Sequence, residues 1–493
     1  CFRVDTETDN LTHEDYMNFR DKIREADGKE IAQFLKHKVF EVKALISASQ
    51  RPMSCVWVRK WKWKDGVRII KSRLCVRGFL DPQKSMLTKH SSTATRLSQK
   101  LIVSNAALND FDMESWDISS AFLQGISFEN IATMCQYLGV PVPAVDRQVF
   151  IVVPDNVWWH LRQQGLPGTP PVSGIATSCL RLLKAMYGLN DAPLLWQLCL
   201  RYFLVRHTGA LLSVFDDNYF YWKDEHGKLK GEATAHVDDG NFTGKPSWLR
   251  FLRELLEKRF GAVSRQTLPM LHVGVTYERL PPPRRGYKLH QRPYALALRP
   301  CQVPQGELTK PLDGELTSVL RSGIGGLLYL CLTRPDLVGD ICLLQTRVCC
   351  GTLQDLRTLN SIVTRAHKYC DYGLIYEWMP PPHCIRGYAD ASYATSKTSY
   401  AVEANLVFKM ADSTLLQAEP STLPLAKREL VPPSEMDGKC HLLVHTGKLA
   451  KRISHNTSHA ESLAQYSVIT HCEMCALRLT ELAAPWTFAM PLK

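Results

Sequence analysis

The stretch TAHVDDGNFTG, at residues 234–244, places two adjacent aspartates after an alternating run of small and apolar residues. Ala233, Ala235 and Val237 occupy alternate positions before the Asp-Asp-Gly sequence at 238–240. This pattern predicts a β-hairpin with two carboxylates at its tip. The same sequence also forms ordinary hairpin turns, so a plain turn is the alternative when the stretch is taken alone.

A third aspartate stands 121 residues earlier, at the start of DISSAFLQG (117–125). Asp117 ends a run that leans apolar, which places it at the end of a strand, where a structural cap is the alternative role. A pair of Mg²⁺ ions about 3.5–4 Å apart needs shared carboxylates. Because Mg²⁺ uses few protein carboxylates together with substrate phosphates, three aspartates are enough for such a site.

Residues 56–77, VWVRKWKWKDGVRIIKSRLCVR, contain a second hairpin signal, because Asp65-Gly66 separates two alternating runs. Trp57, Trp61 and Trp63 share one parity and are expected on one face. A basic strand pair can neutralise nucleic-acid phosphates, and the alternative is a solvated edge hairpin whose charges prevent aggregation. The candidate nucleic-acid-binding residues are Arg59, Lys60, Lys62, Lys64, Arg68 and Arg77.

The composition is that of an ordinary globular protein with a mild basic excess. The 493 residues carry a formal net charge of +12, and 45% of them are apolar. These values exclude collagen-like, coiled-coil and wholly disordered chains, and the charge favours either a polyanionic partner or simple solubility.

No run of 18 apolar residues occurs, so we expect no membrane contact. Scattered cysteines without a signal-peptide pattern indicate reduced thiols in an intracellular protein, and the start at Cys1 leads us to expect a piece of a longer product.

Strands and helices interleave without a regular βαβ rhythm, which favours an α+β fold. Proline runs mark candidate boundaries because proline ends helices and ladders; they lie at 281–283, 380–382 and 432–433. Apolar spacing predicts helices at 29–38, 192–207 and 247–260. A further helix near 459–471 is expected to place Leu463, Tyr466 and Ile469 on one face.

Seven blocks, in order, resemble the reverse transcriptase and ribonuclease H region of copia-type (Ty1/copia, Pseudoviridae-like) retrotransposon Pol polyproteins. They cover roughly residues 29–465, and their order and spacing make the resemblance specific. The blocks are KSRLCVRGF (71–79), WDISSAFLQG (116–125), LLKAMYGLNDAPLLW (182–196), AHVDDG (235–240), HVGVTYER (272–279), SVLRSGIGGLLYLCLTRPDL (318–337) and GYADASYA (387–394).

The resemblance implies a right-hand polymerase with fingers, palm and thumb, followed by a partial ribonuclease H-like mixed α/β domain. The implied divisions are an N-terminal segment at 1–28, fingers and palm at 29–300, thumb and connection helices at 301–380, and an incomplete ribonuclease H-like domain at 381–493 with an insertion at 411–440.

The resemblance also implies roles for matching polymerase residues. Asp117, Asp238 and Asp239 would be the catalytic carboxylates that hold metal. Around the incoming deoxynucleotide, Lys71 and Arg73 would hold the triphosphate, with generic surface charge as the alternative. Ile118 would offer its carbonyl oxygen to the metal. Phe122, five residues after Asp117, would exclude ribonucleotides, with core packing as its alternative.

In the C-terminal block, Asp390 would be the first ribonuclease H metal carboxylate and Glu461, in SHNTSHAESLA (454–464), the second. The sequence departs from the family pattern in several places. Asp191 replaces a glutamine beside the nucleotide and is expected to N-cap the helix that starts at Ala192. His236 replaces a tyrosine, His459 replaces a glutamate, and LTELAAPWTF (479–488) lacks the next aspartate.

The implied function is an RNA-directed DNA polymerase that transfers a nucleotide from a dNTP to a primer 3′-hydroxyl with two Mg²⁺ ions, Mn²⁺ being a possible substitute. Its partners would be an RNA template, a DNA primer, an RNA–DNA hybrid and dNTPs, and the sequence leaves the oligomeric state open. The expected location is a cytoplasmic particle or the nucleus. The alternative is a decayed copy that binds nucleic acid without catalysis, which Asp191, His236 and His459 favour.

Overall fold

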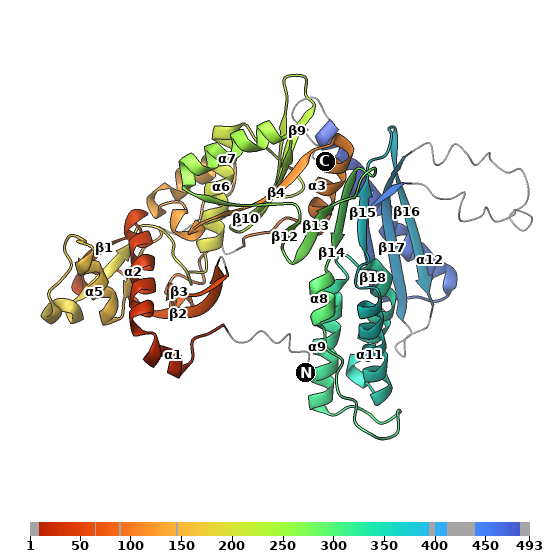
Figure 1. The fold of residues 1–493 in the computed structure, drawn as a ribbon, viewed down its shortest axis with the longest axis horizontal. Helices are drawn as coiled ribbons and strands as arrows, with labels where there is room; N and C mark the ends of the chain where they lie inside the picture. Colours follow the sequence, from red (N-terminus) through yellow and green to blue (C-terminus); the bar gives the residue numbers. More distant parts are fainter. Residues whose placement is uncertain are drawn as a thin grey trace, which may run out of the picture.

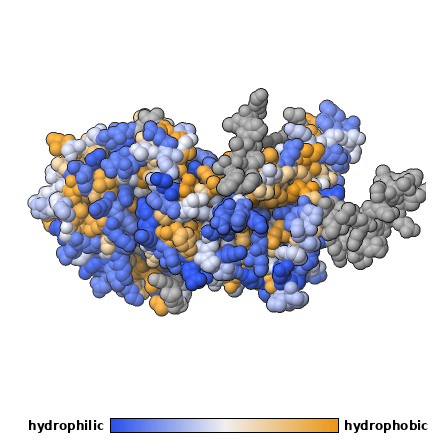
Figure 2. Space-filling model, turned by 90° about the horizontal axis from the view of Figure 1, so that it is seen from above, coloured by the Kyte–Doolittle hydropathy of each residue, from blue (hydrophilic) through white to orange (hydrophobic). Residues whose placement is uncertain are grey.

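The computed structural model describes residues 9–64, 66–87, 90–143, 146–393, 400–411 and 439–483. Four sheets and the helices around them form an α+β architecture, as predicted. Figure 1 shows the fingers elements and the C-terminal sheet at opposite ends of the molecule, with the palm between them. In Figure 2, polar and apolar residues are interspersed over the visible face. No helix in the described part of the chain is long and apolar enough to cross a bilayer.

The fingers are built on a five-stranded sheet whose β2–β3 hairpin follows the sequence prediction. In this hairpin Lys64 lies opposite Val67 and Cys55 opposite Val76. The sheet has the order β1 (Phe40–Ala44), β6 (Ser178–Leu182), β5 (Val149–Val152), β2 (Met53–Lys64) and β3 (Val67–Val76). The helices of this region are α1 (His13–Asn18), α2 (Arg20–Lys36), α4 (Ile131–Leu138) and α5 (Asp155–Gln163).

The palm is a six-stranded sheet that carries the central aspartates. Its order is β11 (Val263–Thr267), β4 (Asp112–Ile118), β10 (Asp239–Gly244), β9 (Leu229–His236), β8 (Tyr219–Lys223) and β7 (Leu211–Leu212). The predicted helices form as α6 (Ala192–Thr208) and α7 (Pro246–Phe260), and α3 (Arg96–Asn109) also packs on it. Gly231 and Gly244 let the Trp248 ring lie directly on the sheet, because a Cβ at either position would collide with it.

A third sheet and a helical cluster follow the palm. The sheet has the order β12 (Met270–His272), β13 (Val275–Arg279), β14 (Gly286–His290) and β15 (Gly373–Glu377). The cluster comprises α8 (Arg292–Ala297), α9 (Gly314–Leu330), α10 (Val338–Gln345) and α11 (Leu353–Lys368). Its buried core includes Ala295 and Leu298, before the predicted boundary at 301, and β15 pairs with β14 across that boundary. The domain divisions therefore stay a prediction.

The C-terminal unit is an antiparallel sheet with one long helix on one face. It consists of β16 (His383–Ser392), β17 (Tyr400–Ala411), β18 (Cys440–Ile453) and α12 (Thr457–Ala483). Most of the predicted insertion, residues 412–438, lies outside the described residues.

The predicted helix forms as part of α12, and the face marked by Leu463, Tyr466 and Ile469 is not the one that packs on the sheet. Tyr466 is 74% exposed and Ile469 54% exposed, whereas Ala460, Ala464 and Val468 are buried against the sheet. Small side chains at these positions let the helix and the sheet approach closely.

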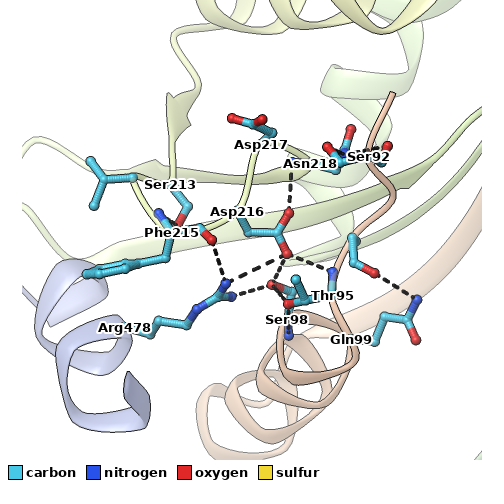
Figure 3. Close-up of polar contacts among 12 residues, drawn as sticks. Ser92, Thr95, Ser98, Gln99, Ser213, Phe215, Asp216, Asp217, Asn218 and Arg478 are labelled. Carbon is cyan, nitrogen blue, oxygen red and sulfur yellow. Dashed lines mark hydrogen bonds and ion pairs between the residues drawn. The ribbon is translucent and has the colours of Figure 1, made fainter. Parts of the chain in front are cut away.

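Buried polar contacts join α12 to the palm and to α3 (Figure 3). The Asp216 carboxylate accepts hydrogen bonds from the Thr95 N–H (2.7 Å) and the Ser98 hydroxyl (2.5 Å). Arg478 of α12 donates to Ser98 and to the Phe215 carbonyl (3.0 Å) and forms an ion pair with Asp216 at 3.8 Å. The C-terminal unit is therefore fixed to the palm sheet and to α3 through groups that are nearly excluded from water.

Candidate active site in the palm

The pairing of β4 with β10 brings the three palm aspartates together. Asp239 lies directly opposite Asp117, and the Ile118 N–H donates to the Asp238 carbonyl at 3.1 Å. Directly opposed residues in antiparallel strands have Cα atoms about 4.5–5.5 Å apart. Asp239 is the first residue of β10 and pairs with His236 of β9, which leaves Val237 and Asp238 as the turn residues. Val237 adopts the left-handed conformation, at φ 59°.

The three carboxylates repel one another. The pKa of Asp239 is raised to about 6, first by partial burial of the carboxyl group and then by the charges of Asp238 and Asp117. The pKa of Asp117 is raised by burial and by Asp238, and Lys71 and Lys62 oppose this shift. A cation placed among these groups would relieve the repulsion.

The donor set fits Mg²⁺, which prefers oxygen ligands and completes its shell with substrate phosphates and water. Among the described residues, no group of three His, Cys, Asp or Glu side chains stands close enough together to hold a metal ion by itself, and this includes the three palm aspartates. An open arrangement of two or three carboxylates is what a cation shared with a substrate requires. Asp117, Asp238 and Asp239 are the residues that could hold it. The predicted carbonyl contact of Ile118 stays a prediction.

One face of the β2–β3 hairpin presents its cations to these aspartates. Lys60 lies opposite Lys71 in the pairing, and Lys62 and Arg73 share their side of the sheet. Lys62, Lys71 and Arg73 all act electrostatically on Asp117. The arrangement therefore sets a positive surface opposite the carboxylates, where a nucleotide or nucleic-acid phosphate would meet both. The side chain of Lys64 lies outside the described part of the chain.

Two of the predicted nucleic-acid-binding arginines are on the other face of the hairpin. Arg59 forms a bidentate ion pair with Asp27 of α2, at 2.9 and 2.6 Å, and its side chain is only 13% exposed. Arg68 lies over the Trp61 ring at 4.8 Å. Strand alternation turns both side chains away from Lys60 and Lys62, so Arg59 and Arg68 do not share the face of the hairpin that lies opposite the aspartates. Arg59 is held by Asp27, and binding of nucleic acid by Arg68 stays a prediction. Arg77 donates to the Ser54 hydroxyl at 3.2 Å and stays exposed.

Phe122 lies beside the basic face as well as against the core. It is half-buried in the short helix Ala121–Gln124 and makes an edge contact with Tyr187 at 5.8 Å between ring centroids. Arg73 lies over the same Tyr187 ring at 5.4 Å. Tyr187 was missed as a site residue, although it belongs to the block MYGLN that the sequence analysis singled out.

Asp191 occupies the N-cap position of α6, as predicted, but its carboxylate caps nothing and is not available to a nucleotide. Its side chain makes no capping hydrogen bond. Both carboxylate oxygens bind the buried Arg147, at 2.8 and 3.3 Å, and Arg147 also binds Asp81 at 2.6 Å. The predicted place beside the triphosphate is corrected, because this carboxylate is 4% exposed and satisfied within the protein. His236, the other palm departure, ends β9 opposite Asp239, and burial lowers its pKa.

Asp390 and Glu461 do not converge. Gly387, Ala389 and Ala391 of β16 face α12, because a Cβ at Gly387 would touch Cys472 and the two alanines pack in one cluster with Ala460. Asp390 has the opposite parity and is exposed on the other face of the sheet. Glu461 lies on α12. The sheet therefore separates the two carboxylates that we expected to share an ion.

The comparisons with known proteins point to one class. No family model matches the chain. It is 23% identical over 398 residues to the retrovirus-related Pol polyproteins from transposons RE2 and RE1 of Arabidopsis thaliana, over 77% of this chain and 25% and 24% of theirs. It is 22% identical over 233 residues to the corresponding polyprotein from transposon TNT 1-94 of Nicotiana tabacum, over 47% of this chain and 15% of that protein.

The curated relatives of this chain are thus transposon Pol polyproteins, which confirms the resemblance found in the seven blocks. The chain spans about a quarter of the length of the first two. Among solved structures, a foamy viral protease-reverse transcriptase in complex with double-stranded DNA matches 95% of this chain and 71% of its own, with a TM-score of 0.45 and 10% identity.

We predict that Asp191→Gln destabilises the protein by about 1–3 kcal/mol, because Arg147 loses a charge-assisted partner inside the core. Urea unfolding measures this loss. Asp371→Asn is the matched control, since Asp371 pairs with Arg292 at the surface (3.3 Å, 66% exposed) and should change stability by less than about 1 kcal/mol. Equal effects of the two substitutions would contradict the buried ion network.

We predict that Asp239→Asn raises the melting temperature at pH 8 without divalent metal. The pKa of Asp239 in the folded protein, about 6, lies above the unfolded value of about 3.9, so ionised Asp239 destabilises the folded state above pH 6. The gain should fade as the pH falls from 6 to 4. Mg²⁺ should stabilise the parent more than the variant. A variant that melts below the parent at every pH would contradict mutual repulsion.

Proposed function

We propose that this chain is the polymerase portion of a transposon Pol polyprotein and acts as an RNA-directed DNA polymerase. The observation that carries the proposal is the register of β4 and β10, which sets Asp117 opposite Asp239 with Asp238 in the adjoining turn. The relatives, transposon Pol polyproteins, support the same activity. The partners would be an RNA template, a DNA primer, their hybrid and dNTPs, in a cytoplasmic particle or the nucleus.

The chain's own residues would position the reactants for transfer of a nucleotide to a primer 3′-hydroxyl. Bound Mg²⁺ supplies charge stabilisation for the attacking oxygen and the leaving pyrophosphate. Asp117, Asp238 and Asp239 would hold the metal, while Lys71 and Arg73 would donate hydrogen bonds to the triphosphate. The positive face of the hairpin lies opposite the carboxylates and would thus orient the phosphates toward them.

Primer extension on a homopolymer RNA template tests the proposal. Asp238→Asn should lower extension by at least about a hundredfold, while hybrid binding in a filter assay stays nearly intact. Asp371→Asn serves as the control. An inactive parent protein that still binds the hybrid would instead favour the decayed copy that we kept as the alternative.

We expect Phe122→Val to admit ribonucleotides, because a smaller side chain leaves room for the 2′-hydroxyl. The ratio of kcat/KM for rNTP to that for dNTP should rise about tenfold or more, equivalent to about 1.4 kcal/mol of discrimination. Single-nucleotide incorporation gives this ratio. An unchanged ratio would leave Phe122 with a packing role against Tyr187 alone.

We predict that substitutions on the two faces of the β2–β3 hairpin differ in their effect on the salt dependence of primer–template binding. Neutralising Lys60, Lys62, Lys71 and Arg73 to Gln should flatten the slope of log affinity against log salt by roughly 0.9 per lost phosphate contact on a duplex. Arg68→Gln, on the opposite face, should leave the slope unchanged. Primer–template titrations at several salt concentrations measure both slopes, and the same flattening by Arg68→Gln would overturn the assignment of faces.

We propose no hydrolytic role for the described part of the C-terminal unit. The opposite placement of Asp390 and Glu461 supports this view, since two-metal hydrolysis needs carboxylates that share ions. In this proposal the unit contributes to the protein through its contacts with α3 and the palm.

A further inference from the structure

A cavity of about 250 Å³ lies where α3, the β12–β15 sheet and the C-terminal unit meet. Its walls are largely apolar, and their apolar residues include Leu97 from α3, Val275 from β13, Leu289 from β14, Leu374 from β15, Leu443 from β18 and Met474 from α12. None of the palm aspartates lines it. The cavity is therefore separate from the candidate active site.

A buried lysine, Lys100, contributes a cationic group to the wall of this cavity. The side chain of Lys100 lines the cavity, the residue is only 8% exposed, and its Nζ donates to Nδ1 of His445 at 2.8 Å. His445 in turn donates from Nε2 to the Cys331 carbonyl at 2.7 Å, which assigns the neutral tautomer with an acceptor at Nδ1. A lysine ammonium has three donors, and this contact uses one.

No carboxylate balances this charge among the described residues that line the cavity. The pKa of Lys100 is lowered to about 7, first by burial and then by the charge of Arg96, which also lines the cavity. A buried charge without a counter-charge is unfavourable in an apolar setting. The shape and chemistry of the space thus complement a molecule with an apolar body and one anionic group.

We propose that this cavity is a binding site for a small organic anion with an apolar body, such as an aryl or short-chain carboxylate or sulfonate, whose anionic group binds Lys100. The ligand would contact the polymerase portion and the C-terminal unit at once. The proposal does not depend on nucleotide transfer, because the site and its residues are distinct from the palm aspartates.

Two fluorescent probes that differ by one charge test the site. 1-Anilinonaphthalene-8-sulfonate carries a sulfonate, and N-phenyl-1-naphthylamine has the same aromatic body without it. Lys100→Met keeps the length of the side chain and removes its charge, so it should weaken the sulfonate about tenfold or more and leave the neutral probe within about twofold. Lys409→Met is the matched control, because Lys409 is equally buried (8% exposed) and lies outside this cavity.

A pH titration of the unaltered protein gives an independent measurement that needs no variant. The affinity for the sulfonate relative to the neutral probe should fall as the pH rises above about 7, because Lys100 loses its proton there. The other groups facing it are Arg96 of α3, His445 of β18, His272 of β12, and His471 and Cys475 of α12. His445 and His272 have pKa values lowered to about 4 by burial, and burial raises the pKa of Cys475 to about 12, so these three stay neutral from pH 6 to 9.

Several outcomes would overturn the proposal. The first is that Lys100→Met lowers the affinity for both probes equally, and the second is that it leaves the affinity for the sulfonate unchanged. The third is that Lys409→Met lowers the affinity for the sulfonate as much as Lys100→Met does. A relative affinity that does not change from pH 6 to 9 would overturn it as well, even if Lys100→Met failed to fold.

Discussion

The backbone pairing of β4 with β10 is the constraint on which the candidate site depends. It sets Asp117 opposite Asp239 although the two are far apart in sequence, and like charges on facing strands oppose such a pairing. The stacked rings of Trp116 and Phe242, with centroids 4.0 Å apart, help to hold the strands from within the core. The sheet thus keeps carboxylates together that would separate if they were free.

Local patterns predicted much of this arrangement, because hairpins and helices depend on neighbouring residues. The 56–77 hairpin and the helices at 192–207 and 247–260 were found from alternation and apolar spacing. Alternation tells which residues share a face but not which face a distant helix covers, and so the pairing of Arg59 with Asp27 of α2 was not foreseen. The spacing of large apolar residues did not indicate which face of α12 packs on the sheet, because Ala460 and Ala464 contribute little to such a pattern.

Contacts between distant segments were beyond the sequence. Asp191 binds Arg147, which also binds Asp81. Arg147 and Asp81 lie 44 and 110 residues from Asp191, and no local pattern links the three. The same holds for Asp390, since its motif matched the family while the side of the sheet it faces depends on where α12 packs. The sequence drew attention to both aspartates. The role of each depends on the distant segment that packs beside it, which is Arg147 for Asp191 and α12 for Asp390.

The contact of Arg478 with Asp216 and Ser98 has a consequence for how the chain can change. If α12 were removed, Asp216 would lose its buried counter-charge, and Ser213 and Val214 would lose the Glu481 carboxylate that accepts their hydrogen bonds. Substitutions that weaken the packing of α12 would thus destabilise this part of the palm, whatever chemistry the C-terminal unit performs. Selection on the stability of the palm alone is enough to preserve a helix that lies more than 200 residues after Asp216 in the sequence.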